Sequence, residues 1–186
     1  MQLTQVLDLS VEVAAGLVSV RDLLPRGISV VESIPTHSFL VRINRAGLTQ
    51  VLAALMLNCS EAMDHRGAVT VSLGGATLNV PAAEALDIER GAYALLSIGD
   101  TGRGIPSDVI PSLFRPLPAG TRVGRGMRLG LPAAGTIVRD WNGAVSVRST
   151  LGLGSIFTLY LPLLAVRTLR LEARLLRHAA RLFRLR

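Results

Sequence analysis

The chain has 186 residues, of which 49% are hydrophobic and 18% are charged, and its formal net charge is +7 at pH 7. This composition excludes a disordered chain, and the length is sufficient for one domain with a packed core. The sequence contains no run of about 18 apolar residues that could span a membrane, no secretory signal, and only one cysteine, Cys59, so it excludes an internal disulfide.

The positive charge is concentrated at the C-terminus. Residues 1–162 contain 13 arginines and 12 acidic residues, whereas residues 163–186 contain seven arginines and one glutamate. The first part is therefore nearly neutral, and the second carries almost all of the net charge. We expect a folded domain over 1–162 and a basic tail over 163–186.

The N-terminal part predicts one helix and two strands. Ser10 is a suitable N-cap for a helix over about 11–24, which Pro25 would end. Residues 28–33 and 39–43 alternate between apolar and polar side chains, as do two strands of a sheet with one solvated face.

A second helix is predicted over about 45–64, with Asn44 as its cap. Apolar side chains recur along it at spacings of three and four residues, which marks one face toward the core. These side chains are Leu48, Val51, Leu52, Leu55 and Cys59.

The C-terminal half predicts four strands and one helix. Residues 69–73 and 93–98 are predicted strands, with a connection over 74–91, and a helix is expected over about 129–140 after a segment rich in proline and glycine at 116–128. A final hairpin is expected, with strands at residues 144–148 and 156–161 around two glycines. Strands and helices are mixed without regular alternation, which favours an α+β fold with helices on one face of a mostly antiparallel sheet.

The stretch from Ser97 to Ile105 is the most informative part of the sequence. A buried apolar run ends there in a single carboxylate, Asp100, which is followed by Gly102 and Gly104. An acid at the end of a core strand, beside backbone without Cβ atoms, suits a flat hydrogen-bond donor such as a purine amine. A tight turn at the end of a strand explains the same residues when they stand alone.

Three further segments accompany this stretch in a fixed order. Asn58 lies inside the apolar pattern of the second helix, residues 124–131 are rich in glycine, and residues 152–157 read Gly-Leu-Gly-Ser-Ile-Phe. Together with Asp100 they resemble the ATP-binding domain of sensor histidine kinases, in the superfamily shared with gyrase, Hsp90 and MutL. The resemblance runs from about residue 6 to residue 162. It implies a two-layer sandwich of a mixed, mostly antiparallel sheet with helices on one face, the Bergerat-type ATP-binding fold.

The resemblance also implies roles for individual residues. Asp100 would accept a hydrogen bond from the adenine amine, and Asn58 would bind Mg²⁺ through its amide oxygen. The other residues that it assigns to nucleotide binding are Thr101, Gly102, Gly104, Ile105, Gly124, Gly126, Leu129, Gly130, Leu131 and Ser155. For Thr101 and Ser155, ordinary turn and strand polarity explains the hydroxyl equally well.

The sequence departs from the family pattern at several positions. Ala54 stands where ATP-hydrolysing relatives have the glutamate that activates water, which speaks against simple hydrolysis. Arg128 replaces a glycine, Thr121 a common lysine and Arg115 a glutamate. The purine end of the site is thus closer to the family pattern than the segment between the two glycine-rich motifs.

The resemblance implies a function and its partners. The expected activity is transfer of the γ-phosphoryl group of ATP, with Mg²⁺, to a histidine on a separate dimerisation hairpin, in the same longer chain or in another, and indirectly to a response regulator. His37, His65 and His178 lack the sequence context of such an acceptor and are expected to be surface or loop residues. Two alternatives remain: a nucleotide-binding regulatory module without phosphoryl transfer, and a serine kinase of the anti-sigma type.

The basic tail is expected to form an amphipathic helix. Six of its arginines recur at spacings of three and four residues, with leucines on a second stripe. Such a helix can bind an anionic membrane surface or an acidic partner, although a solvated extension explains it equally well. Nucleic acid is not an expected partner, because Phe183 is the only aromatic residue among the arginines. The expected location is cytoplasmic, with the tail able to hold the domain at the inner face of the membrane.

Overall fold

The structure is a computed structural model that describes residues 3–115 and 130–164. Its strands are Gln5–Asp8 (β1), Ile28–Ser33 (β2), Leu40–Ile43 (β3), Gly67–Leu78 (β4), Gly91–Asp100 (β5), Ala144–Thr150 (β6) and Gly154–Pro162 (β7). Its α-helices are Leu9–Arg21 (α1), Arg45–Ala62 (α2), Val80–Glu84 (α3) and Leu131–Asp140 (α4), and a 3-10 helix spans Ile110–Ser112. The glycine-rich segment up to residue 129 and almost all of the predicted tail helix lie outside these residues.

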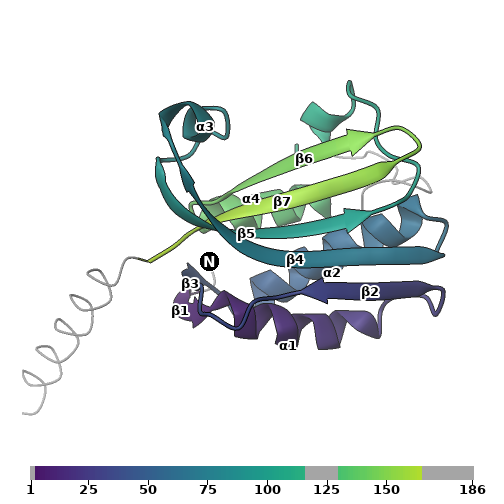
Figure 1. The fold of residues 1–186 in the computed structure, drawn as a ribbon, viewed down its shortest axis with the longest axis horizontal. Helices are drawn as coiled ribbons and strands as arrows, with labels where there is room; N and C mark the ends of the chain where they lie inside the picture. Colours follow the sequence, from purple (N-terminus) through teal and green to yellow (C-terminus); the bar gives the residue numbers. More distant parts are fainter. Residues whose placement is uncertain (1–2, 116–129, 165–186) are drawn as a thin grey trace, which may run out of the picture.

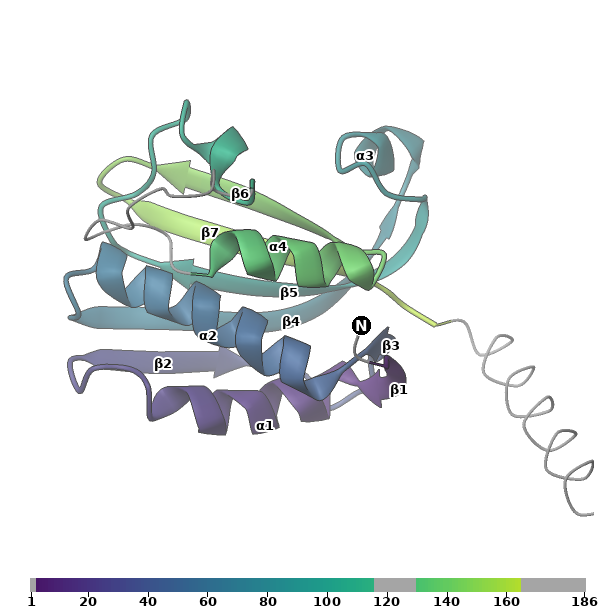
Figure 2. The same ribbon diagram turned by 180° about the vertical axis from the view of Figure 1, so that it is seen from behind.

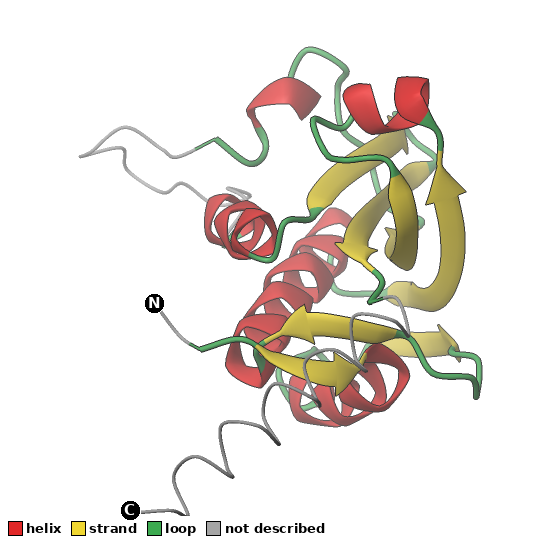
Figure 3. Ribbon diagram, turned by 90° about the vertical axis from the view of Figure 1, so that its left-hand side faces the viewer, coloured by secondary structure: helices red, strands yellow, loops and turns green. Residues whose placement is uncertain are grey.

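Five strands form one mixed sheet in the order β2-β4-β5-β7-β6. β2 is parallel to β4, and the other three neighbouring pairs are antiparallel. The three longer helices, α1, α2 and α4, cover one face of this sheet, and no helix within the described residues covers the other face (Figures 1 and 2). Figure 3 shows the same two layers from the side. The predicted α+β architecture is confirmed.

The two strands predicted near the N-terminus belong to different sheets. β2 joins the five-stranded sheet, whereas β3 pairs with β1 in a separate two-stranded antiparallel sheet. The expectation of one shared sheet was therefore wrong, because β1 was not predicted. β1 has four residues, of which only Leu7 is buried, so it lacks the alternation that identifies a longer strand.

The first helix begins two residues earlier than predicted. Asp8, rather than Ser10, is the N-cap of α1, and its Oδ1 accepts hydrogen bonds from the backbone N–H groups of Ser10 and Phe39, both at 3.1 Å. Burial acts to raise the pKa of Asp8, but hydrogen bonds from Ser38, Phe39 and Ser10 outweigh it and lower the pKa. A carboxylate that satisfies two donors is the better cap, and it ties the start of α1 to β3.

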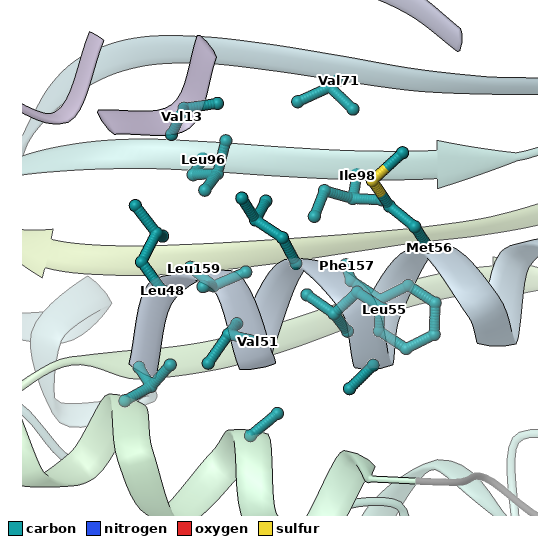
Figure 4. Close-up of a cluster of buried hydrophobic side chains, with 14 of the residues drawn as sticks. Val13, Leu48, Val51, Leu55, Met56, Val71, Leu96, Ile98, Phe157 and Leu159 are labelled. Carbon is teal, nitrogen blue, oxygen red and sulfur yellow. The ribbon is translucent and has the colours of Figure 1, made fainter. Parts of the chain in front are cut away.

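The second helix carries the centre of the core. Asn44 caps α2 as predicted, with its Oδ1 2.6 Å from the backbone nitrogen of Gly47. All five side chains of the predicted stripe are buried between the sheet and the neighbouring helices, and Figure 4 shows several of them beside Leu96, Ile98 and Leu159 of the sheet. The period of the apolar residues therefore located the core-facing side of this helix.

The two hairpins of the sheet are longer than predicted. β4 and β5 extend the expected strands to Leu78 and back to Gly91, and the short helix α3 between them was not predicted. The extension includes Gly74 and Gly75, whose lack of side chains removes the alternating pattern on which a strand prediction rests. The final hairpin, β6 and β7, is confirmed with two or fewer added residues at each end.

Candidate functional site

A cavity of about 230 Å³ lies at the end of β5. Its wall is formed by the C-terminal part of α2, the loop after β5, the start of α4 and the start of β7. Its apolar lining residues are Ile105, Pro106, Val109, Leu113, Leu131 and Phe157. Its polar lining residues are Asn58, Glu61, Asp100, Arg103 and Ser155. An apolar cavity with a few polar groups is typical of a small-molecule site.

Asp100 is a buried carboxylate with donors on several sides. The residue is 8% exposed. The backbone N–H of Gly102 donates to its Oδ1 at 2.8 Å, and the thiol of Cys59 and the backbone N–H of Ser155 are further donors. Burial raises the pKa of Asp100, and these hydrogen bonds act against the rise. A carboxylate fixed in this way and open to a cavity can accept a hydrogen bond from a ligand N–H group.

Cys59 lies behind this carboxylate in the core and is fully buried. Burial and the charge of Asp100 raise the pKa of the thiol well above its usual value. Cys59 therefore stays protonated and acts as a donor to Asp100, and its burial agrees with its predicted place on the core-facing side of the second helix.

The loop after β5 is fixed to two other elements. The backbone N–H of Arg103 donates to Ala62 O at the end of α2, at 3.0 Å. The backbone N–H of Gly152, in the β6–β7 turn, donates to Arg103 O at 2.9 Å, and the N–H of Ile105 donates to Ser149 Oγ at 2.8 Å. These bonds hold the loop between α2 and the last hairpin.

Two glycines make this close approach possible. A Cβ atom at Gly102 would overlap the backbone of Ala62, and one at Gly104 would overlap the carbonyl of Thr150. Gly104 also has a φ of +71°, in the left-handed region that favours glycine. Any larger residue at either position would push the loop away from its partners.

Asn58 and Glu61 lie one helical turn apart on α2 and both line the cavity. The Nδ2 of Asn58 donates to Ala54 O at 2.5 Å. Because the amide nitrogen takes part in this bond, the amide oxygen is the side-chain atom suited to a cation, and a hard oxygen is the type of ligand that Mg²⁺ prefers.

The position of the missing general base is packed against the next helix. A Cβ atom at Gly130, the N-cap of α4, would lie 2.9 Å from the Cβ of Ala54. A side chain at position 130 would therefore press against Ala54, so glycine fits this position. Ala54 itself carries no carboxylate that could act as a general base.

Ser149, Ser155 and Asp100 lie in register on three adjacent strands, β6, β7 and β5. Ser155 is 3% exposed and lines the cavity. The Oγ of Ser149 is 3.0 Å from the Oγ of Ser155 and 2.9 Å from Gly154 O. Asp100 thus has a connected pair of hydroxyl groups beside it.

Val109 and Leu113, which flank the 3-10 helix, and Leu131 of α4 form one part of the cavity wall. Phe114 packs on Gly135 of α4, and its ring meets that of Phe157 edge to face, with centroids 6.5 Å apart. α4 begins at Leu131, which is almost fully buried and lines the cavity. The first turn of a helix leaves backbone N–H groups without a partner within the helix. In α4 the second residue, Pro132, has no N–H, and the first, Leu131, lines the cavity.

The structure brings half of the predicted site residues together. The predicted residues that line the cavity are Asn58, Asp100, Gly104, Ile105, Leu131 and Ser155. Thr101, Gly102 and Gly130 lie next to lining residues without lining the cavity themselves, and the hydroxyl of Thr101 contacts the sulfur of Met63 at 3.7 Å. Gly124, Gly126 and Leu129 lie outside the described residues, as do Thr121 and Arg128.

Sequence reasoning missed several members of the cavity. Glu61 and Arg103 line it, as does an apolar wall that includes Val109 and Leu113. Glu61 follows Asn58 by three residues on a helix, a spacing that places both on one face and was a usable signal. The role of Ser149 as a bridge between loop and hairpin depends on distances that the sequence does not contain.

Two of the three histidines lie in the described residues, and neither lines the cavity. The ring of His37 is 4.6 Å from that of Phe39, and the Nδ1 of His65 is 3.0 Å from Ser60 Oγ. In the same part of the chain, no three His, Cys, Asp or Glu side chains form a group able to hold a metal, and no helix has the length and apolar character to cross a membrane.

The family model for histidine kinase-, DNA gyrase B- and HSP90-like ATPases matches residues 43–165. The sensor kinase CckA of Brucella abortus is 34% identical over 118 residues, which cover 61% of this chain and 12% of that protein. The sensor histidine kinase ZraS of Escherichia coli K12 is 35% identical over 115 residues, or 62% of this chain and 21% of that protein. The matched segment is thus a small part of these relatives.

Solved structures share the fold. The ATP-binding domain of PrrB from Mycobacterium tuberculosis superposes with a TM-score of 0.64 at 16% identity, covering 88% of this chain and all of that one. The histidine kinase domain of the E. coli osmosensor EnvZ gives a TM-score of 0.60 at 20% identity, covering 89% of this chain and 92% of that one. These likenesses establish the fold.

Proposed function

The chain belongs to the family of histidine kinase-, DNA gyrase B- and HSP90-like ATPases, and we propose that it is the ATP-binding catalytic domain of a two-component sensor histidine kinase. One observation carries the proposal: the cavity at the end of β5 contains a buried carboxylate, Asp100, fixed by neighbouring donors beside an apolar wall. This arrangement is complementary to an adenine ring with its exocyclic amine.

The adenine would lie with its amine toward Asp100. The carboxylate is held by Gly102 and Ser155 from the protein side, so its remaining acceptor capacity is directed to the ligand. The faces of the ring would pack against apolar side chains such as Ile105 and Leu131. Ser155 would contact the ring edge directly or through water.

The phosphates would lie toward α2 and α4. Asn58 would bind Mg²⁺ through its amide oxygen, and the ion would supply charge neutralisation of the phosphates when bound. The start of α4 presents backbone N–H groups and the positive end of a helix dipole toward this side, which favours a phosphate. Gly124, Gly126 and Leu129 remain predicted phosphate-side residues in the segment before α4.

The chemistry that suits this site is phosphoryl transfer to an acceptor outside it. Ala54 offers no general base that could activate water for hydrolysis. The residues would bind and orient ATP, and a histidine on a separate hairpin domain would attack the γ-phosphorus in line. A response regulator would then receive the phosphoryl group from that histidine. We assign this domain to residues 1–162, in the cytoplasm, and we propose that the tail over 163–186 contacts an anionic membrane surface.

Transfer of labelled phosphate tests this function. The full chain, Mg²⁺ and γ-labelled ATP are mixed with a dimerisation hairpin that carries the acceptor histidine, taken from a related kinase. We expect acid-labile, base-stable label on the hairpin, which is characteristic of phosphohistidine, and no label when Asn58→Ala replaces the wild type.

Two outcomes would redirect the proposal. Acid-stable label on a serine of the partner would identify a serine kinase of the anti-sigma type. Tight ATP binding without label on any of several matched hairpins would identify a nucleotide-binding regulatory module. A hairpin with its histidine replaced by alanine is the matched control for either result.

A further inference from the structure

The hydroxyl of Ser149 has three polar neighbours, and only one proton. The backbone N–H of Ile105 donates to it at 2.8 Å, Gly154 O lies at 2.9 Å, and Ser155 Oγ lies at 3.0 Å. A carbonyl oxygen can only accept, so the Ser149 proton belongs to Gly154 O. The N–H of Ile105 uses one lone pair of Ser149, and the other is available to Ser155.

This arrangement determines the direction of the bond between the two serines. Because Ser149 has no second proton, Ser155 must be the donor in the contact between the two hydroxyl groups. The proton of Ser155 then points toward β6, and its lone pairs are left for the cavity that it lines. Next to it on β5 stands Asp100, which when ionised is also only an acceptor.

We propose that Ser149 is a positioning residue that sets the purine specificity of the site by holding the Ser155 hydroxyl as an acceptor. The inference rests on the proposed function, since it concerns the same nucleotide site. Two neighbouring acceptors match a 6-amino purine, whose exocyclic nitrogen carries two protons. A 6-oxo purine, such as inosine or guanine, places an acceptor oxygen against at least one of them, and the site rejects it.

The consequence for Ser149→Ala is specific. Without the Ser149 hydroxyl, the Ser155 proton is released and can turn toward the cavity, where it can donate to a 6-oxo group. ATP then loses an acceptor partner and inosine triphosphate gains a donor. We expect the ratio of ATP to inosine triphosphate affinity to fall by about tenfold, the change that one hydrogen bond of roughly 1.4 kcal/mol gives.

The experiment is a titration of the full chain with ATP and with inosine triphosphate, each with Mg²⁺, for wild type, Ser149→Ala and Ser149→Thr. Ser149→Thr keeps the hydroxyl and should keep the wild-type ratio. A Ser149→Ala variant that weakens both nucleotides equally would show a purely structural role and overturn the inference.

A double-mutant cycle separates the pathway through Ser155 from other effects. In the background of Ser155→Ala, the further change Ser149→Ala should leave the affinity ratio unchanged, because the hydroxyl that it controls is gone. A ratio that still falls would contradict the inference. If Ser149→Ala does not fold by circular dichroism, Ser155→Ala alone decides: it should lower the ratio, and an unchanged ratio refutes the acceptor role.

Different results would contradict the proposed function and the acceptor role of Ser155. A wild-type chain that binds neither nucleotide contradicts the proposed function itself. A wild-type chain that binds ATP tightly, but with no preference over inosine triphosphate, contradicts only the assignment of Ser155 as an acceptor.

Discussion

The two sides of the cavity are built by different means. On the strand side, Asp100 and Ser155 are positioned by strand register, and Ser149 and the loop after β5 add hydrogen bonds from three directions. On the helix side, Asn58 and Glu61 depend on the position of α2, and Asn58 bonds to the carbonyl of the preceding turn. The strand side is thus suited to hold a flat, rigid ring. The helix side is suited to the proposed phosphate groups and their metal ion.

The two sides of the cavity should therefore respond differently to substitution. A larger residue at a glycine of the loop after β5 displaces backbone that several elements share, so it affects folding and binding together. A change on the helix side removes one side chain from a stable helix, so it affects the ligand and leaves the fold intact.

Gly104→Val is expected to have the largest effect. The new side chain would overlap the carbonyl of Thr150, and a β-branched residue is strained at a φ of +71°. We expect a loss of about 2–4 kcal/mol in the free energy of unfolding, by analogy with strained and overpacked sites, together with loss of ATP binding. Urea denaturation followed by circular dichroism measures the first effect. A stable Gly104→Val variant that binds ATP normally would contradict the expectation that this loop is needed for both folding and binding.

Asn58→Ala should affect the ligand only. Removing the amide oxygen takes away the proposed Mg²⁺ ligand but leaves a good helix former in α2. We expect the Mg²⁺-dependent part of the ATP affinity to fall by about tenfold, equal to about 1.4 kcal/mol, with ATP binding in EDTA unchanged. Calorimetric titration with and without Mg²⁺ checks this. Equal losses under both conditions would show that Asn58 contributes to packing rather than to the metal.

Asp8→Ala is the control far from the cavity. The substitution removes the N-cap of α1 and the acceptor for the N–H of Phe39, so it should cost about 1 kcal/mol of stability. The ATP affinity should not change. The pKa of Asp8 is lowered in the folded chain, so this stabilisation is present above the usual aspartate range and lost as the pH falls through the lowered value. Thermal unfolding at neutral and acidic pH measures the effect in both variants.

The pH dependence of ATP binding should show the smallest effect. Burial raises the pKa of Asp100, and only the ionised carboxylate is a pure acceptor. Because the folded pKa is raised, ATP affinity should weaken as the pH falls toward it, at a pH above the ordinary aspartate range, by less than about tenfold per pH unit for a single titrating group. Asp100→Asn should lack this dependence. A wild-type profile that is flat down to the ordinary aspartate range would contradict the acceptor role.

Much of the site could be predicted from the sequence because a motif is a local pattern. Asp100 at the end of an apolar strand, Gly104 after it and Asn58 in an apolar helix are each recognisable in a few residues, and the structure brings them to one cavity. The apolar period of α2 likewise located the core. Each of these features can be recognised from residues that are close together in the sequence, within a single helix, strand or loop.

The remainder depended on long-range contacts. β1 was not predicted, because it has only four residues with one buried side chain, and it is identified as a strand only by its pairing with β3. The N-cap of α1 was assigned to Ser10, because the bond from Phe39 that favours Asp8 comes from a residue 31 positions away. The role of Ser149 was not predicted, because its contact with Ile105 joins residues 44 positions apart.

The account depends most directly on the interaction between Asp100 and an adenine ring. Isothermal titration of the full chain with a non-hydrolysable ATP analogue and Mg²⁺, compared with Asp100→Asn, measures it. We expect saturable binding by the wild type and a loss of about 10- to 100-fold in the variant, the effect of removing a hydrogen bond to a charged group of about 1.5–3 kcal/mol. Circular dichroism should show that the isosteric variant keeps the fold. No binding by the wild type, or equal binding by a folded Asp100→Asn variant, would contradict the account.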